Sequence, residues 1–413
     1  DNCQHVLLGH CTNLAALYQR LGVGEAIRWF DQMTFVEPGG RRSVLEPSAL
    51  PAPLHAMPAF LRAPAFSRAD KVAIARGMAA FIPPLPPDSA ENFDQWLLRH
   101  KQTPGAIERF WKPIMVSALN EDLDRVSVRY AGQVVRLSLL RSPEAGRMGV
   151  PRIPLSDLYS RAAGYIEARG GRVHLRTAAE DASWSEDRQQ WTVRAQNQSF
   201  SSDALILALA FEGLSKLLPS LPQNQEAERL AANLERFEHS PITGIHLWFD
   251  REITDLDHAI LLDRTIQWMF HKSRLQPEKR SSAAGSYIEL VVSASKSMVE
   301  MQRQEIIDLA LAELGEFFPA VREARLLKAA VVKEVRATYS VVPQLDLFRP
   351  TAVSPWPRAF LAGDWTATGW PATMEGAVRS GCLSAEALAR AAGKPARFLE
   401  PDLPARGLMR LLP

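Results

Sequence analysis

The most informative stretch of the chain reads Phe360-Leu-Ala-Gly-Asp-Trp-Thr-Ala-Thr-Gly-Trp-Pro-Ala-Thr-Met-Glu-Gly-Ala-Val-Arg-Ser-Gly381. It predicts a short apolar strand ending at Gly363-Asp364, a loop rich in Thr, Gly and Trp, and a helix that begins near Met374. An acidic strand end beside a helix N-terminus is the layout of a dinucleotide site, because the free N–H groups and the helix dipole attract anionic groups. A single Gly-rich loop is a weak motif, and the pattern also suits an ordinary strand-loop-helix unit.

The stretch from Gly363 to Gly381 resembles the C-terminal flavin-binding motif of the FAD-dependent amine oxidase and phytoene desaturase superfamily. Within that superfamily it looks like the squalene-associated branch, the hydroxysqualene dehydroxylases of hopanoid biosynthesis. Asp1–Gly9, Phe110–Asn120 and the segment from Ala337 to Asp346 agree with this resemblance. The resemblance covers essentially the whole chain, and it is specific at both ends and loose in the middle.

The resemblance implies an α/β fold, in which a Rossmann-like FAD-binding domain carries an inserted α+β substrate domain. The FAD-binding domain would be discontinuous and comprise residues 1–12, 145–215 and 341–395. The substrate or cap domain, with a helical segment, would comprise residues 13–144 and 216–340. FAD is the cofactor that this arrangement implies.

One expected motif does not occur in the chain. A flavoprotein of this superfamily should open with a strand, a Gly-x-Gly-x-x-Gly turn and a helix, with an acidic residue at the next strand end. The sequence starts at Asp1 without Met. We therefore expect an N-terminally truncated fragment whose first βαβ unit and Gly-Gly-Arg turn lie upstream; the alternative is a protein that never had the unit. We expect the 413 residues alone to bind FAD weakly or not at all.

Asp364 is the strongest candidate for cofactor binding. A carboxylate at a strand end accepts hydrogen bonds from ribose or ribityl hydroxyls, although it also suits a loop cap. The backbone N–H groups of Thr373, Met374 and Glu375 would face the pyrimidine edge of the flavin and stabilise negative charge there. Trp370 would form the wall beside the ring, or simply pack in the core. The resemblance adds three further cofactor-binding positions: Val173, through its backbone near the adenosine, Gly363 and Ala377.

Three residues are candidates for proton transfer. His5 lies in a segment that passes close to the flavin in the superfamily, and its ordinary pKa is near neutrality. Tyr339 and Asp346 precede the flavin motif in a loop that would face the substrate. A lone His is more often structural than catalytic. The nine His residues are dispersed, no Ser-His-Asp or Cys-His set stands out, and no metal site is predicted.

The composition, with 46% hydrophobic and 23% charged residues, is that of a globular protein. A net charge of +2 with scattered Lys and Arg argues against nucleic-acid binding. Cys3, Cys11 and Cys382 lack metal-ligand spacing and indicate buried thiols in a reducing compartment. No secretory signal or membrane-spanning run appears in the sequence. These features predict a cytoplasmic location, with peripheral contact at the inner face of the membrane as an option.

That option rests on Pro47–Pro87, a segment rich in Pro, Ala, Phe, Leu and Met. Ser67–Phe81 fits an amphipathic basic helix, which either packs in the core or lies on a membrane. Phe110, Trp111, Ile114 and Met115 share one side of a second helix, Gly105–Leu119, which is either core or the lining of a hydrocarbon pocket. The residues offered for membrane contact are Phe60, Leu61, Arg62, Phe66, Arg68, Lys71, Ile74, Arg76, Met78 and Phe81.

Other elements follow from periodicity and capping signals. The sequence predicts helices at Asn13–Gly22, Pro154–Arg169 and Met298–Phe318, and a helix capped by Asp88-Ser89 that ends at His100. It predicts a turn followed by a strand within Gly170–Arg176, and a hairpin at Trp184–Ser199. Further strands are predicted at Asp203–Leu209, Ile242–Phe249, Ile266–Phe270, Tyr287–Ser293 and Leu326–Thr338.

The function that the resemblance implies is reduction of hydroxysqualene to squalene by an FAD-dependent oxidoreductase. The allylic hydroxyl would leave with acid help, and a hydride would take its place. The partners would be a long-chain isoprenoid substrate and an unidentified electron donor. The alternatives are a carotenoid-type or phytoene-type desaturase, an amine oxidase on the same fold, and a non-catalytic fragment that no longer binds FAD. An amine oxidase should show an aromatic cage, and none is identifiable.

Overall fold

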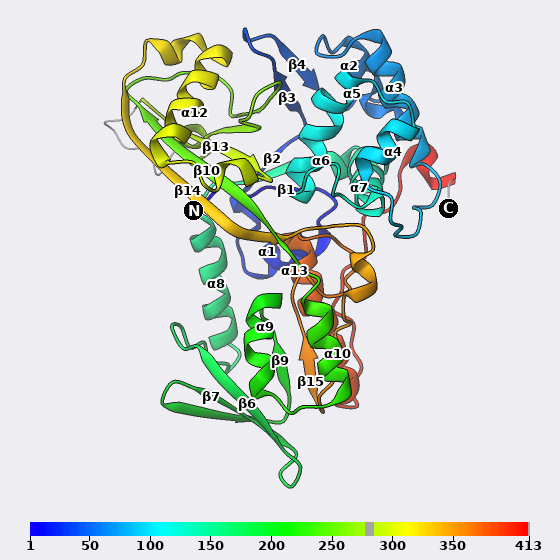
Figure 1. Ribbon diagram of the computed structural model, residues 1–413, viewed down its shortest axis with the longest axis vertical. Coiled ribbons are helices and arrows are strands. Elements are labelled where there is room, and N and C mark those ends of the chain that lie inside the picture. The colour runs from blue at the N-terminus through cyan, green and yellow to red at the C-terminus, as the bar shows by residue number, and fades with distance from the viewer. Residues whose placement is uncertain (277–284, 412–413) are drawn as a thin grey trace.

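The computed structural model describes residues 1–276 and 285–411. Figure 1 shows an elongated molecule with a broad part that holds a large sheet and a cluster of helices, and a narrower part below it that holds smaller sheets. Helices α1 (Thr12–Arg20) and α13 (Met374–Ala391) lie between the two parts. The predicted mixed α/β class is confirmed.

The large sheet has the strand order β14-β10-β13-β12-β11-β3-β4 among the described residues. Its strands are β3 (Met33–Val36), β4 (Arg42–Leu45), β10 (His239–Phe249), β11 (His258–Leu261), β12 (Trp268–His271), β13 (Ser286–Ser293) and β14 (Leu326–Tyr339). β10 is antiparallel to both β13 and β14. β3 joins strands from far along the chain through a parallel pairing with β11.

Helix α12 (Arg303–Phe317) packs against this sheet. Leu314 and Phe317 of the helix are buried in one apolar cluster with Ile245 and Leu290 of the strands. Burial of such side chains, at roughly 25 cal/mol for each Å² of apolar surface, is the main stabilising contribution to this layer. The helix is shorter than the predicted Met298–Phe318, because Gln302 and Glu305 form a capping box that fixes its start.

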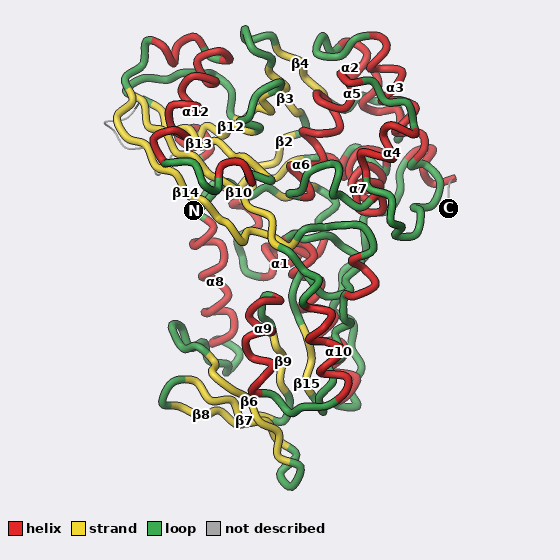
Figure 2. The backbone as a smooth tube through the Cα atoms, viewed as in Figure 1, coloured by secondary structure: helices red, strands yellow, loops and turns green. Residues whose placement is uncertain are grey.

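The helical cluster lies beside the free edge of β3 and β4 (Figure 2). It comprises α2 (Met57–Arg62), α3 (Arg68–Ala80), α4 (Phe93–Arg99), α5 (Pro104–Ala106), a π-helical turn (Ile107–Trp111), α6 (Lys112–Leu119) and α7 (Val128–Val134). Its centre is aromatic: Trp96 stacks on Phe81 with ring centroids 4.4 Å apart, and Trp111 meets Phe93 edge-on. Trp111 and Met115 are fully buried, which favours the core interpretation of this helix face.

The narrower part contains the strand of the opening motif. Strand β15 (Ala359–Leu361) lies parallel to β9 (Leu205–Leu207), and α9 (Phe211–Leu217) and α10 (Gln225–Leu234) lie beside them. Below is a meander of β6 (Ala179–Ser185), β7 (Gln190–Ala195) and β8 (Gln198–Ser202), one strand more than the predicted hairpin. A third small sheet consists of β1 (Leu7–Leu8), β5 (Met148–Pro151) and β2 (Ile27–Phe30).

Helix α8 (Leu155–Glu167) lies on the left side of the narrower part in Figure 1 and buries a single residue, Leu158. The next segment corrects a prediction, because Gly170–Arg176 forms no strand. Leu175 is 80% exposed and Arg176 has a φ of 56°, so the segment has neither the burial nor the extended backbone of a strand. β9 is also shorter than the predicted Asp203–Leu209, and Ile206 within it is exposed.

The predicted cap of the helix that ends at His100 is also wrong, because Asp88-Ser89 does not cap it. α4 begins at Phe93 and is capped by Asn92, whose side chain accepts a hydrogen bond from the Gln95 backbone N–H at 2.9 Å. Asp88 instead accepts a hydrogen bond from the Ser127 hydroxyl at 2.8 Å.

The apolar residues offered for membrane contact are mostly interior. Phe66, Ile74 and Phe81 are buried in the core, and Phe60 and Met78 are partly buried against it. Of the six, only Leu61 is exposed. No helix in the described part of the chain is both long enough and apolar enough to span a bilayer.

Candidate active site

The loop after β15 is shaped by a glycine and a tryptophan. A Cβ on Gly363 would lie 2.2 Å from the indole nitrogen of Trp365, so no other residue fits without movement. The Trp365 side chain is fully buried, and its Nε1–H donates to the Leu209 carbonyl at 2.8 Å. Trp365 therefore ties the loop to the end of β9, and Gly363 makes the space for it.

Helix α13 begins as the sequence predicts. Thr373 is its N-cap, and the Thr373 hydroxyl accepts a hydrogen bond from the Gly376 N–H at 3.0 Å. The first N–H groups of a helix have no acceptor within the helix, and this cap satisfies only the one at Gly376. Among the described residues no acceptor meets the N–H groups of Met374 and Glu375, so they are left for a ligand at the positive end of an 18-residue helix.

The carboxylate of Glu375 has a different function from its backbone. It accepts hydrogen bonds from the Leu14 N–H at 2.7 Å, the Asn13 N–H at 3.2 Å and the Asn13 amide at 3.0 Å. Glu375 therefore holds the start of α1, whose own N-cap, Cys11, makes no side-chain hydrogen bond. The sequence analysis missed this contact because it joins residues more than 360 positions apart.

Trp370 lies beside the start of α13 and is buried. Burial is expected both for a wall beside the cofactor and for a residue packed in the core. Its ring stacks on the imidazole of His10, with centroids 5.3 Å apart, and the Arg379 guanidinium lies 5.2 Å from the ring centroid. His10 was not among the predicted site residues. Burial lowers its pKa to about 4, so the imidazole is neutral at physiological pH. Its Nδ1 lies 3.3 Å from the Ala145 carbonyl oxygen, to which a protonated Nδ1 donates, and 3.4 Å from the Ser138 hydroxyl.

The buried guanidinium of Arg349 joins three of the predicted residues. It donates to the Asp364 carbonyl at 2.9 Å and to the Asp346 carboxylate at 3.0 Å, and it lies 5.6 Å from the ring centroid of Tyr339. Tyr130 completes the cluster, with its hydroxyl hydrogen-bonded to both Arg349 and Asp346. Arg349 was not among the predicted site residues. The only sequence signal for it is its position, fifteen residues before Asp364.

Burial shifts the pKa values of two titratable groups in this cluster. Burial raises the pKa of the Asp364 carboxyl, and the charge of Arg349 partly offsets that effect. Burial also raises the pKa of the Tyr339 phenol, whose hydroxyl has no hydrogen-bond partner in the described part of the chain. Asp346 is paired with Arg349 and with Arg129, whose Nε lies 3.3 Å away. The geometry therefore makes Asp346 a counter-ion of two arginines, and its part in proton transfer stays a prediction.

The structure does not bring the remaining candidates into these two groups. His5 makes its hydrogen bond within its own segment, between Nδ1 and the Cys3 carbonyl at 3.0 Å. Val173 lies in the irregular segment that follows α8. Ala377 is exposed on α13. Their roles stay predictions.

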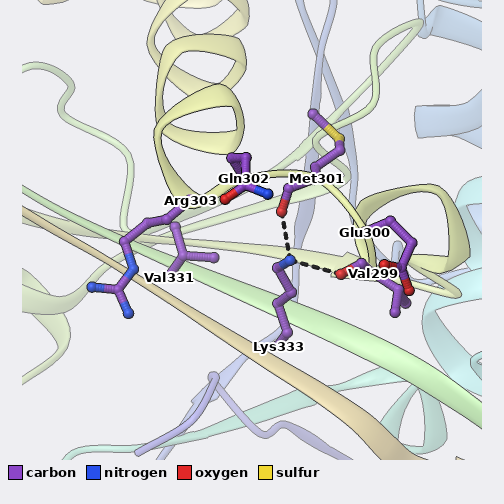
Figure 3. Close-up of a pocket in the computed structure, with 7 residues that line it drawn as sticks. All are labelled: Val299, Glu300, Met301, Gln302, Arg303, Val331 and Lys333. Carbon is purple, nitrogen blue, oxygen red and sulfur yellow. Dashed lines mark hydrogen bonds between the residues drawn. The ribbon is translucent and has the colours of Figure 1, made fainter.

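A cavity of about 490 Å³ lies elsewhere, between the segment before α12 and strand β14 (Figure 3). It is lined by Val299, Glu300, Met301, Gln302, Arg303, Val331 and Lys333. The Lys333 ammonium donates to the carbonyls of Val299 at 2.7 Å and Met301 at 2.6 Å. Its donors are thus used to hold the chain, and the cavity contains no predicted site residue.

The fold and this site define a class of protein. A strand end, a loop fixed by buried side chains and a helix N-terminus with free N–H groups fit a flat, electron-rich cofactor in an α/β oxidoreductase. The chain belongs to the family of flavin-containing amine oxidoreductases, whose profile matches residues 1–389. The predicted superfamily is confirmed, and membership of a flavin-containing family confirms FAD as the predicted cofactor.

Characterised relatives are similar over most of the chain. The 15-cis-phytoene desaturase of Synechococcus elongatus is 26% identical over 409 residues, which cover 93% of this chain and 84% of the relative. The probable zeta-carotene desaturase of the same organism is 25% identical over 429 residues, 94% of this chain and 88% of the relative.

Solved structures share the fold. An oxidoreductase from Methanosarcina mazei superposes with a TM-score of 0.68 at 15% identity, covering 91% of this chain and 86% of that one. A triple mutant of putrescine oxidase gives a TM-score of 0.65 at 16% identity and covers 95% of this chain and 86% of its own. The protein is therefore a flavin-dependent oxidoreductase by family, and these distant structures add agreement in fold alone.

Proposed function

We propose that the protein is an FAD-dependent oxidoreductase of a long-chain isoprenoid. The observation that carries this proposal is the start of α13, where Thr373 caps one N–H and the N–H groups of Met374 and Glu375 are left for the cofactor. FAD, when bound, supplies hydride transfer to or from carbon. The relatives named as carotenoid desaturases support the isoprenoid substrate class.

The residues at the site have three tasks in this proposal. The N–H groups at the start of α13 bind and orient the electron-rich edge of the flavin. The Asp364 carboxylate accepts hydrogen bonds from cofactor hydroxyls. Trp370 and the neutral imidazole of His10 form a buried wall that excludes water from the ring.

Two reactions fit this site, and they differ in redox direction. Desaturation of a phytoene-like or carotenoid substrate is favoured by the named relatives. Reduction of hydroxysqualene to squalene rests on the motif from Gly363 to Gly381. Desaturation needs an electron acceptor and dehydroxylation needs an electron donor, so the identity of the redox partner follows from the reaction. Oxidation of an amine is the third option, and the similarity to putrescine oxidase supports it through the fold alone.

Substrate delivery is part of the proposal. An apolar isoprenoid is almost insoluble in water, so we propose peripheral contact with the membrane through α2 and α3. The exposed apolar residues of this region are Leu50, Leu54, Met57, Leu61 and Val72.

The test is to supply purified protein with FAD and to follow bound flavin by its absorbance. The loaded protein is then incubated separately with phytoene, hydroxysqualene and putrescine, with a quinone as oxidant or dithionite as reductant, and products are identified by mass spectrometry. We expect loss of two hydrogens from phytoene, or conversion of hydroxysqualene to squalene under reducing conditions. Turnover of putrescine alone would overturn the isoprenoid proposal.

A further inference from the structure

Arg349 is the most heavily hydrogen-bonded buried cation beside the candidate active site. Its side chain is 1% exposed. The guanidinium donates to three successive carbonyls of the loop, those of Asp364 at 2.9 Å, Trp365 at 3.3 Å and Thr366. A further hydrogen bond reaches the Thr368 hydroxyl at 3.3 Å. One side chain thus fixes the inner side of the whole turn between β15 and α13.

We propose that Arg349 is a positioning residue, which sets the loop Asp364–Thr368 in the shape that binds the cofactor. The inference rests on the proposed FAD site. Only arginine has five N–H donors in a rigid planar fork, and three carbonyls that converge on one point require such a fork. A lysine ammonium at this position carries the same charge but is a single nitrogen, so it cannot reach the same set of acceptors.

The charge of Arg349 is balanced inside the protein. A buried cation without a partner would be costly, and Asp346 supplies the partner at 3.0 Å. The Tyr130 hydroxyl accepts from Arg349 and donates to Asp346, which closes the cluster. Arg129 contacts the other carboxylate oxygen from a partly exposed position and reaches none of the loop carbonyls.

The arrangement separates the two polar ends of Asp364. Its carbonyl is held by Arg349. Its carboxylate accepts only backbone hydrogen bonds, from its own N–H and that of Trp365, and no side chain in the described part of the molecule donates to it. The neighbouring loop amides are also occupied: the Thr366 N–H donates to Gly363 and the Ala367 N–H to Pro350. Because the loop backbone is fixed, the distance and orientation between the Asp364 carboxylate and the start of α13 stay constant. A bound flavin that contacts both requires this.

The experiment compares wild type with Arg349→Lys, Arg349→Ala and the control Arg129→Lys in the full-length protein, including any segment upstream of Asp1. Hydrogen exchange of flavin-free protein reports on residues 363–370, and flavin fluorescence titration gives the dissociation constant for FAD. For Arg349→Lys we expect faster exchange confined to this loop and FAD affinity lower by about tenfold to hundredfold, because charge-assisted hydrogen bonds are lost. Arg129→Lys should leave both unchanged.

Chemical rescue distinguishes positioning from general damage to the fold. Guanidinium at millimolar concentration should enter the space left in Arg349→Ala, slow the loop exchange and restore part of the FAD affinity. Exchange in β10 and β13 should not respond.

Three outcomes would overturn the inference: unchanged loop exchange in Arg349→Lys, unchanged FAD affinity, or destabilisation that spreads evenly over the sheet with no rescue. Wild type that binds no FAD, while the loop still loosens in the variant, would overturn the cofactor part alone. Failure of the proposed reaction is separate, since it would show as absent turnover in wild type with FAD bound.

Discussion

At the scale of single residues, the proposed cofactor site gives Asp364 and Arg349 different tasks: the Asp364 carboxylate would bind the cofactor, and Arg349 would position the loop backbone. In the full-length protein we expect Asp364→Ala to weaken FAD binding by about tenfold, while turnover of the flavin-loaded fraction changes little, because in the proposed site the carboxylate binds cofactor hydroxyls and takes no part in the chemistry. Flavin retained after dialysis measures the first effect, and turnover per bound flavin measures the second. Asp187→Ala, in an exposed turn between β6 and β7, is the matched control. Equal flavin retention in Asp364→Ala and wild type would contradict the assignment.

His10 gives a pH dependence of known sign. Its pKa is lowered from 6.5 to about 4 by burial, so the unfolded chain binds a proton between these values and the folded protein does not. Stability should therefore fall as pH drops from 6.5 to 4, by up to about 3 kcal/mol from this group. His10→Asn should flatten the profile of unfolding free energy over that range, as measured by urea denaturation. The exposed His174→Asn is the control and should leave the profile as it is.

At the scale of elements, α1 and α13 depend on each other through Glu375. The Glu375 side chain is fully buried and satisfies two backbone N–H groups of α1, so Glu375→Gln, which loses the charge, should lower the free energy of unfolding by about 1–3 kcal/mol. Thermal or urea unfolding tests this. Glu167→Gln at the exposed end of α8 should have almost no effect. A loss for Glu375→Gln as small as that of the control would show that the cap contributes nothing measurable.

Local sequence signals correctly predicted the elements that form through interactions between residues close in sequence. The helix that begins near Met374 and the strands β10, β13 and β14 follow from the sequence pattern. The segment Gly170–Arg176 has the composition of a strand, but a strand forms only where a neighbour pairs with it, and composition does not supply one. The pairing of β3 with β11 and the contacts of Arg349 and Glu375 join distant residues, so no local pattern announces them.

The division into domains stays a prediction, although its elements can be placed in the fold. Residues 33–45 share the large sheet with strands of the segment 239–339, which is the kind of pairing that an inserted domain with two sequence segments requires. Figure 1 places the start of α13 between this sheet and the smaller sheet of β9 and β15. A ligand at that helix start is thus close to both halves, which is where binding sites commonly form.

At the scale of the whole molecule, the question is how a water-insoluble substrate of the proposed kind would reach the candidate active site. Helices α2 and α3 form an outer corner of the broad part in Figure 1, on the side of the helical cluster away from the meander β6–β8. Leu61 is 57% exposed and Val72 61% exposed at this corner, and Arg62, Arg68 and Arg76 are exposed around them. Exposed apolar and basic side chains on the same two helices fit an anionic bilayer surface, and each basic residue near such a surface adds about 1 kcal/mol of attraction. The corner therefore suits the uptake of a hydrocarbon from the membrane.

Liposome co-sedimentation tests this uptake route. We expect the protein to sediment with anionic vesicles at low salt, and to be released both by Leu61→Ser with Val72→Ser and by changing Arg62, Arg68, Lys71 and Arg76 to Glu. Activity on detergent-dispersed substrate should persist in these variants, because the changed residues lie outside the candidate active site. Leu175→Ser is the matched control: Leu175 is 80% exposed in the narrow part, remote from the corner, and its loss should not alter sedimentation. If wild type does not sediment with anionic vesicles at low salt, the corner is ordinary protein surface and the substrate must reach the site by another route.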